Sequence, residues 1–309
     1  MSRRAWLLFG LMAVLWGIPY LFIRIAVTQV SPVWLVFVRT GLAALVLLPL
    51  AAPRGALKGL GRQLPWVALL AAMGVAGPFL AISYGEERIP SSLSGLLVAA
   101  EPLLIAGLAL RVDTSERVRG WRLVGLVLGF LGVVCLLGLD LGPRPRLLAG
   151  AVMVLLGALG YAAGALLVKR RFAGYPPLGV ATATVTASAL VLLPAAALSP
   201  PARVPSPAVL GSLAVLGVAC TALGYLAFYS LIGLAGASRA SVITYLNPAV
   251  AVGLGVAVLG EPLTWGMVAG FVLVITGSWL STGGRLPRRP ASPATAPAGP
   301  SPPRPGPPP

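Results

Sequence analysis

The sequence predicts an all-α membrane protein of ten transmembrane helices, arranged as two inverted-topology repeats of five helices each. Three observations support this prediction. Hydrophobic residues make up 58% of the 309 residues and charged residues only 10%, whereas a typical soluble domain carries about 25% charged residues. The chain divides into ten apolar runs of membrane-spanning length. Several uncommon residues of its first half recur 145 positions later.

The ten apolar runs are separated by short segments that hold most of the Arg, Lys, Pro and acidic residues. The runs cover residues 5–27, 33–51, 66–84, 92–110, 121–138, 147–168, 177–197, 207–232, 238–259 and 265–282. A backbone that faces lipid must satisfy its own hydrogen bonds, so the runs are expected to be helices. A β-barrel would need strands of alternating polarity, and the continuous apolar run 103–110 does not alternate.

The basic residues predict the orientation of the chain. If the N-terminus lies in the cytoplasm, the segments on that side hold 17 of the 23 Lys and Arg residues, and the opposite segments hold four. Positive residues favour the cytoplasmic side of a membrane, so both termini are expected there. Topology thus explains the net charge of +16 better than nucleic-acid binding does.

The internal repeat divides the chain into residues 1–138, residues 147–282 and a Pro-rich tail, 283–309, that is expected to be disordered. The residues that recur after 145 positions include the pairs Pro32 and Pro177, Pro49 and Pro194, Trp16 and Tyr161, Tyr84 and Tyr229, Glu116 and Glu261, and Gly125 and Gly270. Because each copy has an odd number of spans, the second copy enters the membrane from the opposite side. Inverted repeats of this kind are typical of secondary transporters.

Several motifs resemble the drug/metabolite transporter superfamily, and its EamA-type members in particular. The motifs are Leu15-Trp16-Gly17, Arg39, the segment from Ser91 to Glu101-Pro102, Tyr245-Leu246-Asn247-Pro248, Leu259-Gly260-Glu261-Pro262 and the Gly-rich last run. The first half departs from the pattern, because residues 111–116 lack the usual Gly before Glu. The resemblance implies two EamA repeats around a central cavity, a small-metabolite substrate and a bacterial inner membrane. It leaves the choice between monomer and homodimer open.

Glu101 is the one acidic residue near the middle of an apolar run. An ionisable group inside a membrane is costly, which makes it a candidate functional residue. Glu101 is expected either to exchange protons during transport or to bind a substrate amine. A structural ion pair with Arg39 is the alternative. The repeat position of Glu101 is occupied by the neutral Asn247, so only one half carries the charge.

Arg39 and a set of aromatic and hydroxyl residues complete the candidate site. Arg39 can hold a substrate carboxylate through its planar guanidinium group, or instead extend to the membrane interface. The other candidates lie on helix faces expected to line a cavity: Trp16, Tyr20, Tyr84, Tyr225, Tyr229, Thr244 and Asn247. For aromatic residues near the ends of runs, the interfacial belt is the alternative interpretation.

The sequence contains no histidine and none of the common metal or nucleotide motifs. No metal, cofactor, nucleic-acid partner or enzymatic activity is therefore expected. The predicted function is secondary active transport of a small metabolite, such as an amino-acid-like molecule, by an exporter with proton coupling as one option. The rival functions are a membrane scaffold or accessory protein and a lipid-modifying membrane enzyme. A channel is disfavoured, since no ring of like charges or repeated filter sequence occurs.

Overall fold

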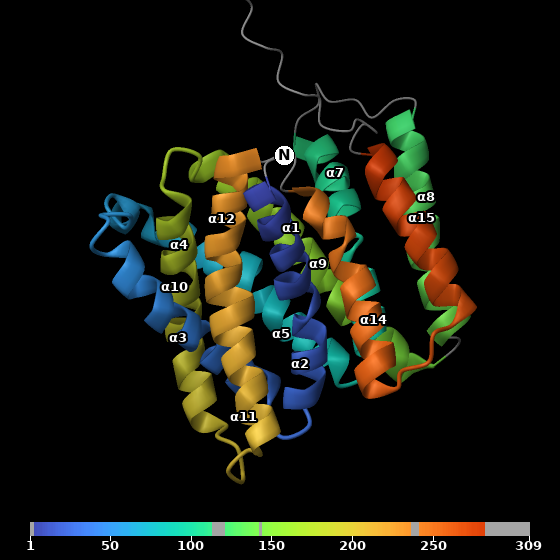
Figure 1. Cartoon of the computed structure of the whole chain (residues 1–309), viewed down its shortest axis with the longest axis horizontal. Coiled ribbons are helices and arrows are strands. Elements are labelled where there is room, and N and C mark those ends of the chain that lie inside the picture. The colour runs from blue at the N-terminus through green and yellow to red at the C-terminus, as the bar shows by residue number, and fades with distance from the viewer. Residues whose placement is uncertain (1–2, 113–120, 142–143, 236–240, 282–309) are drawn as a thin grey trace, which may run out of the picture.

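The computed structural model describes residues 3–112, 121–141, 144–235 and 241–281. These residues form ten apolar spans, of which seven contain helices of 18 residues or more and three contain shorter apolar helices. Figure 1 shows the spans side by side in one helical bundle. The predicted fold class is therefore confirmed. The expectation of a disordered tail, residues 283–309, lies outside the described residues.

The first repeat contributes five spans in chain order. Its elements are α1 (Arg3–Gly17) with α2 (Pro19–Ala26), α3 (Pro32–Ala51), the continuous series η1 (Leu60–Gln63), α4 (Leu64–Ala71), η2 (Ala72–Ala76) and α5 (Gly77–Glu86), then α6 (Ser91–Val98) with α7 (Glu101–Val112), and α8 (Trp121–Leu141). Prolines at the first positions of α2 and α3 favour these two starts, because their fixed backbone angle suits a helix and their missing N–H is not needed there.

The second repeat contributes the remaining five spans. Its elements are α9 (Pro145–Arg171), α10 (Pro177–Leu198), the continuous series α11 (Pro207–Ala214), η3 (Val215–Leu223) and α12 (Gly224–Ala235), then η4 (Ser241–Tyr245) with α14 (Asn247–Leu259), and α15 (Trp265–Ser281). The third and eighth spans each contain a π-helical segment, η2 and η3. The two segments overlap after a shift of 145 residues, so the repeat extends to an uncommon local structure.

The fourth and ninth spans are interrupted at equivalent places. Helix α6 ends at Val98 and α7 begins at Glu101, whereas η4 ends at Tyr245 and α14 begins at Asn247. A proline follows each of these starting residues, and a proline disfavours a helical conformation in the residue before it and cannot donate the helical hydrogen bond. The expected continuous helical run 92–110 is therefore two half-helices. For the same reason Thr244 and Asn247 do not share one helical face.

The contacts between spans reflect the inverted repeat. Helices α3 and α10 pack against each other, as do α8 and α15 and also α6 and α14, and the two members of each pair come from corresponding spans of the two repeats. Helices α1 and α2 pack against α12 and α11, while α5 packs against α9, so the first and third spans exchange partners between the repeats. Figure 1 shows α8 and α15 together at one edge of the bundle.

Glycines allow the closest of these helix contacts. A side chain at Gly277 on α15 would collide with the backbone of Gly125 and Gly129 on α8, and a side chain at Gly164 on α9 would meet Gly74. Small residues at such positions let two backbones approach closely. The Gly-x-x-x-Gly patterns Gly125 to Gly129 and Gly160 to Gly164 thus serve packing within the chain.

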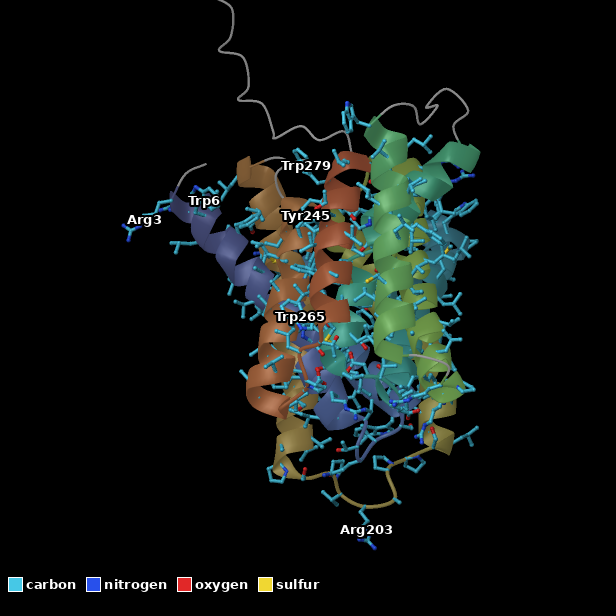
Figure 2. All side chains as sticks on the ribbon, turned by 90° about the vertical axis from the view of Figure 1, so that its right-hand side faces the viewer. Arg3, Trp6, Arg203, Tyr245, Trp265 and Trp279 are labelled. Atoms are coloured by element: carbon cyan, nitrogen blue, oxygen red, sulfur yellow. The ribbon has the colours of Figure 1, made fainter. Side chains whose placement is uncertain are left out.

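The lateral surface of the bundle is apolar. Large hydrophobic side chains such as Leu45, Phe130 and Leu190 are more than 60% exposed. An apolar surface of this extent is suited to contact with lipid tails. The bundle ends carry different residues, and Figure 2 shows Arg203 at one end and Arg3 and Trp6 at the other.

Candidate functional site

A cavity of about 710 Å³ lies between the two repeats. Its size falls within the range of small-molecule sites, about 300–1,000 Å³. Its polar and aromatic lining comes from both repeats and comprises Trp16, Tyr20, Arg39, Phe79, Glu101, Tyr161, Lys169, Phe172, Tyr175, Thr184, Tyr225, Phe228 and Asn247. Leu70, Val75 and Val180 are among the apolar lining residues. The site therefore combines a few polar groups with mainly apolar walls.

The cavity opens toward the end of the bundle that carries the start of α1. Its lining continues to Lys169 near the end of α9, to Ala173 in the α9–α10 connection and to Pro177 at the start of α10, and these three residues are exposed. We call this end the open face. The opposite end, formed by the α2–α3, α5–α6, α10–α11 and α14–α15 connections, contributes no lining residue among those described, and we call it the sealed face.

The repeat places polar residues in the cavity as pairs. Trp16 and Tyr161 occupy equivalent positions, and so do Arg39 and Thr184. Glu101 and Asn247 correspond as the first residues of the half-helices α7 and α14. All six residues line the cavity. The two charged members of these pairs, Arg39 and Glu101, both belong to the first repeat, whereas the second repeat contributes the charged residue Lys169 near the open face.

Arg39 is held by groups from both repeats. Its Nε donates a hydrogen bond to Thr221 Oγ1 over 2.9 Å, and Thr221 lies in η3 of the second repeat. Its guanidinium carbon lies 3.7 Å from the centre of the Phe79 ring, a distance that allows a cation–π interaction. The side chain is buried, with an exposed fraction of 6%. These contacts position a fixed positive charge in the cavity wall.

Glu101 and Arg39 line the same cavity without forming an ion pair. The one ion pair within 4.0 Å among the described residues joins Arg88 and Glu87. The sequence alternative of a structural Arg39–Glu101 pair is therefore absent from the part of the chain that the structure describes. Both charged groups remain available to a bound molecule.

Aromatic rings form much of the remaining wall. The rings of Trp16 and Phe228 lie with centroids 4.7 Å apart, and those of Phe79 and Tyr161 are 6.2 Å apart in an edge-on arrangement. Tyr20 is buried in the lining. Rings in these arrangements give the cavity apolar surfaces with fixed orientation.

Two of the residues predicted from the sequence, Tyr84 and Thr244, do not line the cavity. The prediction for Tyr229 concerns a side chain outside the described part of the structure. Conversely, Tyr161 and Thr184 line the cavity without having been selected as candidates. The shift of 145 residues relates Tyr161 to Trp16 and Thr184 to Arg39, and this relationship could have identified both as candidates from the sequence.

Contacts between the two repeats close the sealed face. The carboxylate of Glu261, in the α14–α15 connection, accepts hydrogen bonds from the Ser91 and Ser92 backbone N–H groups over 2.8 and 2.9 Å, and from the Ser91 hydroxyl over 2.9 Å. It thereby caps the N-terminus of α6. Gln29 also exchanges two hydrogen bonds with Ser206, at the start of α11.

No cluster of three or more residues able to hold a metal ion occurs among the described residues. The two cysteines are both free, with Cys220 buried and Cys135 partly exposed. The polar groups of the described cavity are one guanidinium, one carboxyl, the Lys169 ammonium group near the open face, an amide, hydroxyls and aromatic rings.

Comparisons with known proteins agree with this architecture. The model of the EamA-like transporter family matches residues 4–138 and again residues 148–283. An uncharacterized transporter of Archaeoglobus fulgidus is 26% identical over 90% of this chain and 98% of its own length. A probable amino-acid metabolite efflux pump of Salmonella typhimurium is 26% identical over 94% of this chain and 99% of its own length.

A solved crystal structure supports the fold independently. It superposes on this chain with a TM-score of 0.64 and 21% sequence identity, covering 91% of this chain and 97% of the other. The family model covers most of the chain, once in each half, and describes membrane transporters rather than enzymes. The chain, with its two repeats around a central cavity, therefore belongs to the EamA-like transporter family.

Proposed function

We propose that this transporter exports an amino acid or an amino-acid-like metabolite by alternating access. The observation that carries the proposal is a single cavity lined by both Arg39 and Glu101, which do not pair with each other. A substrate with a carboxylate and an ammonium group can satisfy both charges at once. The efflux-pump name of the Salmonella relative supports the same substrate class.

Arg39 is the group that would hold the substrate carboxylate. A guanidinium group offers two parallel N–H donors to a carboxylate. The bond from Nε to Thr221 and the contact with Phe79 fix its position, so little side-chain entropy is lost on binding. Trp16, Tyr20 and Tyr225 would contact the rest of the molecule together with Asn247, and the volume leaves room for an apolar side chain.

Glu101 is the group that would hold the substrate ammonium. The same carboxyl can hold a proton when the cavity is empty, because a membrane-buried carboxylate without a positive partner is costly. Binding of an ammonium group and binding of a proton then exclude each other. Export of the substrate in exchange for a proton that enters is antiport. In this way the proton gradient would drive export of the substrate.

The direction of transport follows from the predicted orientation. If the chain spans a bacterial inner membrane with both termini on the cytoplasmic side, the open face of this state faces the cytoplasm. An exporter loads its substrate from that side. The two repeats, taken as 1–138 and 147–282, would be the moving bodies. Both repeats of one chain line the cavity, so we take a single chain as the transporting unit, in a monomer or in a homodimer.

The test uses purified full-length protein in proteoliposomes. Wild-type protein is expected to move a zwitterionic amino acid faster when a pH gradient is imposed, and Glu101→Gln is expected to lose that dependence. Glu87→Gln is the matched control, because Glu87 pairs with Arg88 outside the cavity lining. Full retention of gradient dependence by Glu101→Gln would show that Glu101 does not couple protons. Failure of every amino acid tested would exclude the substrate class.

A further inference from the structure

Glu86 is a buried carboxyl group that the cavity does not use. It is the last residue of α5, and its exposed fraction is 0%. Both of its carboxyl oxygens lack a hydrogen-bond partner within the described part of the chain, as does the hydroxyl of Ser83 one turn earlier. Buried polar groups are nearly always hydrogen-bonded, so an unpartnered carboxyl requires an explanation.

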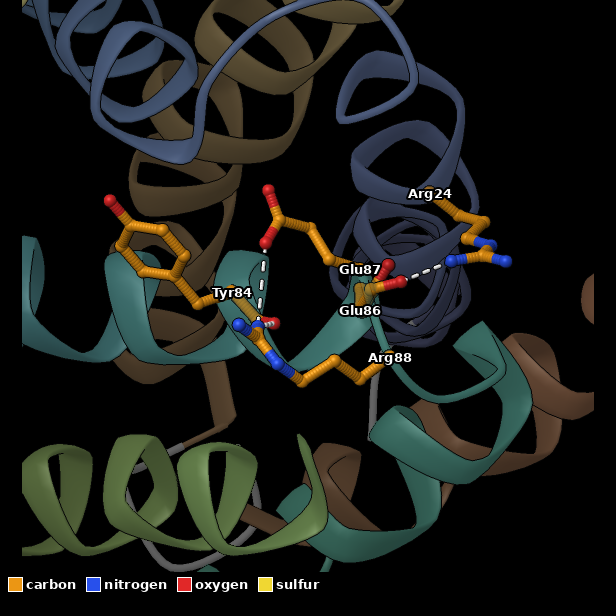
Figure 3. A network of polar contacts seen from close by, with 5 residues as sticks. All are labelled: Arg24, Tyr84, Glu86, Glu87 and Arg88. Atoms are coloured by element: carbon orange, nitrogen blue, oxygen red, sulfur yellow. Dashed lines mark hydrogen bonds and ion pairs between the residues drawn. The ribbon is translucent and has the colours of Figure 1, made fainter. Parts of the chain in front are cut away.

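The charged groups around Glu86 donate no hydrogen bond to its carboxyl oxygens in the described part of the chain. The Arg24 guanidinium, from α2, donates to the backbone carbonyl of Glu86 (Figure 3). Glu87 and Arg88 pair with each other over 3.4 Å. The positive charges of Arg24 and of Arg39 from α3 favour a negative charge on Glu86, and the carboxylate of Glu261 from the α14–α15 connection disfavours it. Helix α9 presents uncharged Gly150 and Val154 at this level.

The backbone N–H groups at the start of α6 are not available as donors to Glu86, because Glu261 already binds them. The Ser91 and Ser92 backbone N–H groups at the start of α6 are already bonded to the Glu261 carboxylate. A second carboxylate nearby would face both the repulsion of Glu261 and the loss of hydration. An ionised, desolvated carboxylate without donors costs several kcal/mol, whereas the protonated acid avoids most of that cost. The closed arrangement is thus compatible with a protonated Glu86.

We propose that Glu86 is a proton-binding site of the sealed face, which must hold a proton for that face to close. When the contacts of Glu261 and Gln29 break and water enters, Glu86 releases its proton to that water, and Arg24 becomes the partner of the carboxylate. When the face closes again, one proton is taken up from the same side. The proposal rests on alternating access in this family, and not on the substrate proposed above.

The proposal predicts how pH acts on the conformational equilibrium. Because closure takes up one proton, acid on the sealed side favours the closed face and alkali favours opening. Proton linkage limits the effect of one group to about a tenfold change in the open-to-closed ratio per pH unit. This pH effect is expected without any substrate.

Ser92 offers a reporter for opening. Its side chain is fully buried and its hydroxyl has no hydrogen-bond partner in the described residues, so a cysteine there removes no side-chain bond. We would place Ser92→Cys in a chain with Cys135→Ala and Cys220→Ala, and label it with a membrane-impermeant maleimide in nanodiscs. Arg203→Cys, an exposed site on the same face, corrects for the intrinsic pH dependence of thiol labelling.

The corrected labelling rate is expected to rise with pH by up to about tenfold per unit in the wild-type background. Glu86→Gln, which stays neutral, is expected to label slowly at every pH. Glu86→Asp keeps a titratable carboxyl and should keep the pH response, and Glu87→Gln should behave like wild type. A wild-type pH response in Glu86→Gln overturns the proposal.

Infrared difference spectra of the wild-type protein against Glu86→Gln provide a second measurement, which does not require the sealed face to open. At neutral pH we expect the wild-type protein to show the C=O stretch of a protonated carboxylic acid that Glu86→Gln lacks. Carboxylate bands in its place would overturn the proposal even if Ser92→Cys never labels. Thermal unfolding of each variant separates a folding defect from a loss of titration. Neither measurement includes an amino acid, so a wrong substrate assignment leaves the outcome unaffected.

Discussion

The Arg39 Nε donates a hydrogen bond to Thr221 Oγ1, and this bond connects the second span of the first repeat to the π-helical segment of the eighth span. Thr221 Oγ1 also donates to the carbonyl of Leu216, five residues earlier. The π-helical geometry therefore supplies the acceptor that orients the cavity's buried cation. Local helix irregularity in one repeat thus positions a charge belonging to the other.

Replacing Arg39 with lysine should weaken substrate binding while leaving the charge in place. Lysine cannot present two parallel donors to a carboxylate and cannot reproduce the Nε bond to Thr221. We expect the dissociation constant of an amino-acid substrate to rise by at least about tenfold, as measured by calorimetry on purified protein. Arg54→Lys, at an exposed position beyond α3, is the control. Equal affinity of Arg39→Lys and wild type would exclude direct carboxylate recognition.

Thr221→Val should have a smaller effect through the position of Arg39. Valine has nearly the same shape but offers no acceptor, so Arg39 loses one orienting bond worth about 1 kcal/mol. We expect a fall of roughly fivefold in substrate affinity, and Thr221→Ser should restore most of it. The effects of Thr221→Val and Arg39→Lys should not add, because both remove the same bond. Strict additivity would contradict this relationship.

Gly17→Ala should destabilise the fold. A Cβ at Gly17 would lie 2.5 Å from Val250 Cβ and 3.0 Å from the carbonyl oxygen of Asn247, where α1 crosses α14. Overpacking of this kind costs about 1–3 kcal/mol, so the apparent melting temperature in detergent should fall. Gly10→Ala in the same helix meets no atom within 4 Å and should leave stability unchanged or slightly higher. Similar melting temperatures for the two variants would argue against the close crossing.

Gln29→Leu should loosen the sealed face. The Gln29 side chain donates to Ser206 Oγ and accepts from its backbone N–H, at 3.0 and 2.8 Å. Both groups are near the surface, so the loss should be about 1 kcal/mol or less. We expect a few-fold increase in labelling of Ser92→Cys. Thr28→Val is the neighbouring control, because the Thr28 hydroxyl bonds only to Ile25 of its own repeat among the described residues. Unchanged labelling in Gln29→Leu would show that the contact between Gln29 and Ser206 does not hold the sealed face closed.

The sequence alone was sufficient to predict the ten spans, their helical nature and the two inverted repeats. These properties depend on hydropathy, on the length needed to cross a bilayer and on an odd number of spans per copy. The same repeat offset pairs Trp16 with Tyr161 and Arg39 with Thr184, although their common position in a cavity needed the structure. Periodicity relates positions in the two halves, but it does not show which neighbours each position faces.

The tertiary structure decided which polar residues share a site. It placed Arg39 and Glu101 in one cavity, left Tyr84 and Thr244 outside its lining, and buried Glu86 at the end of α5. The physical reason is that the burial of a side chain depends on the rotation of its helix and on the spans packed against it. Those contacts join residues more than a hundred positions apart, as between Arg39 and Thr221.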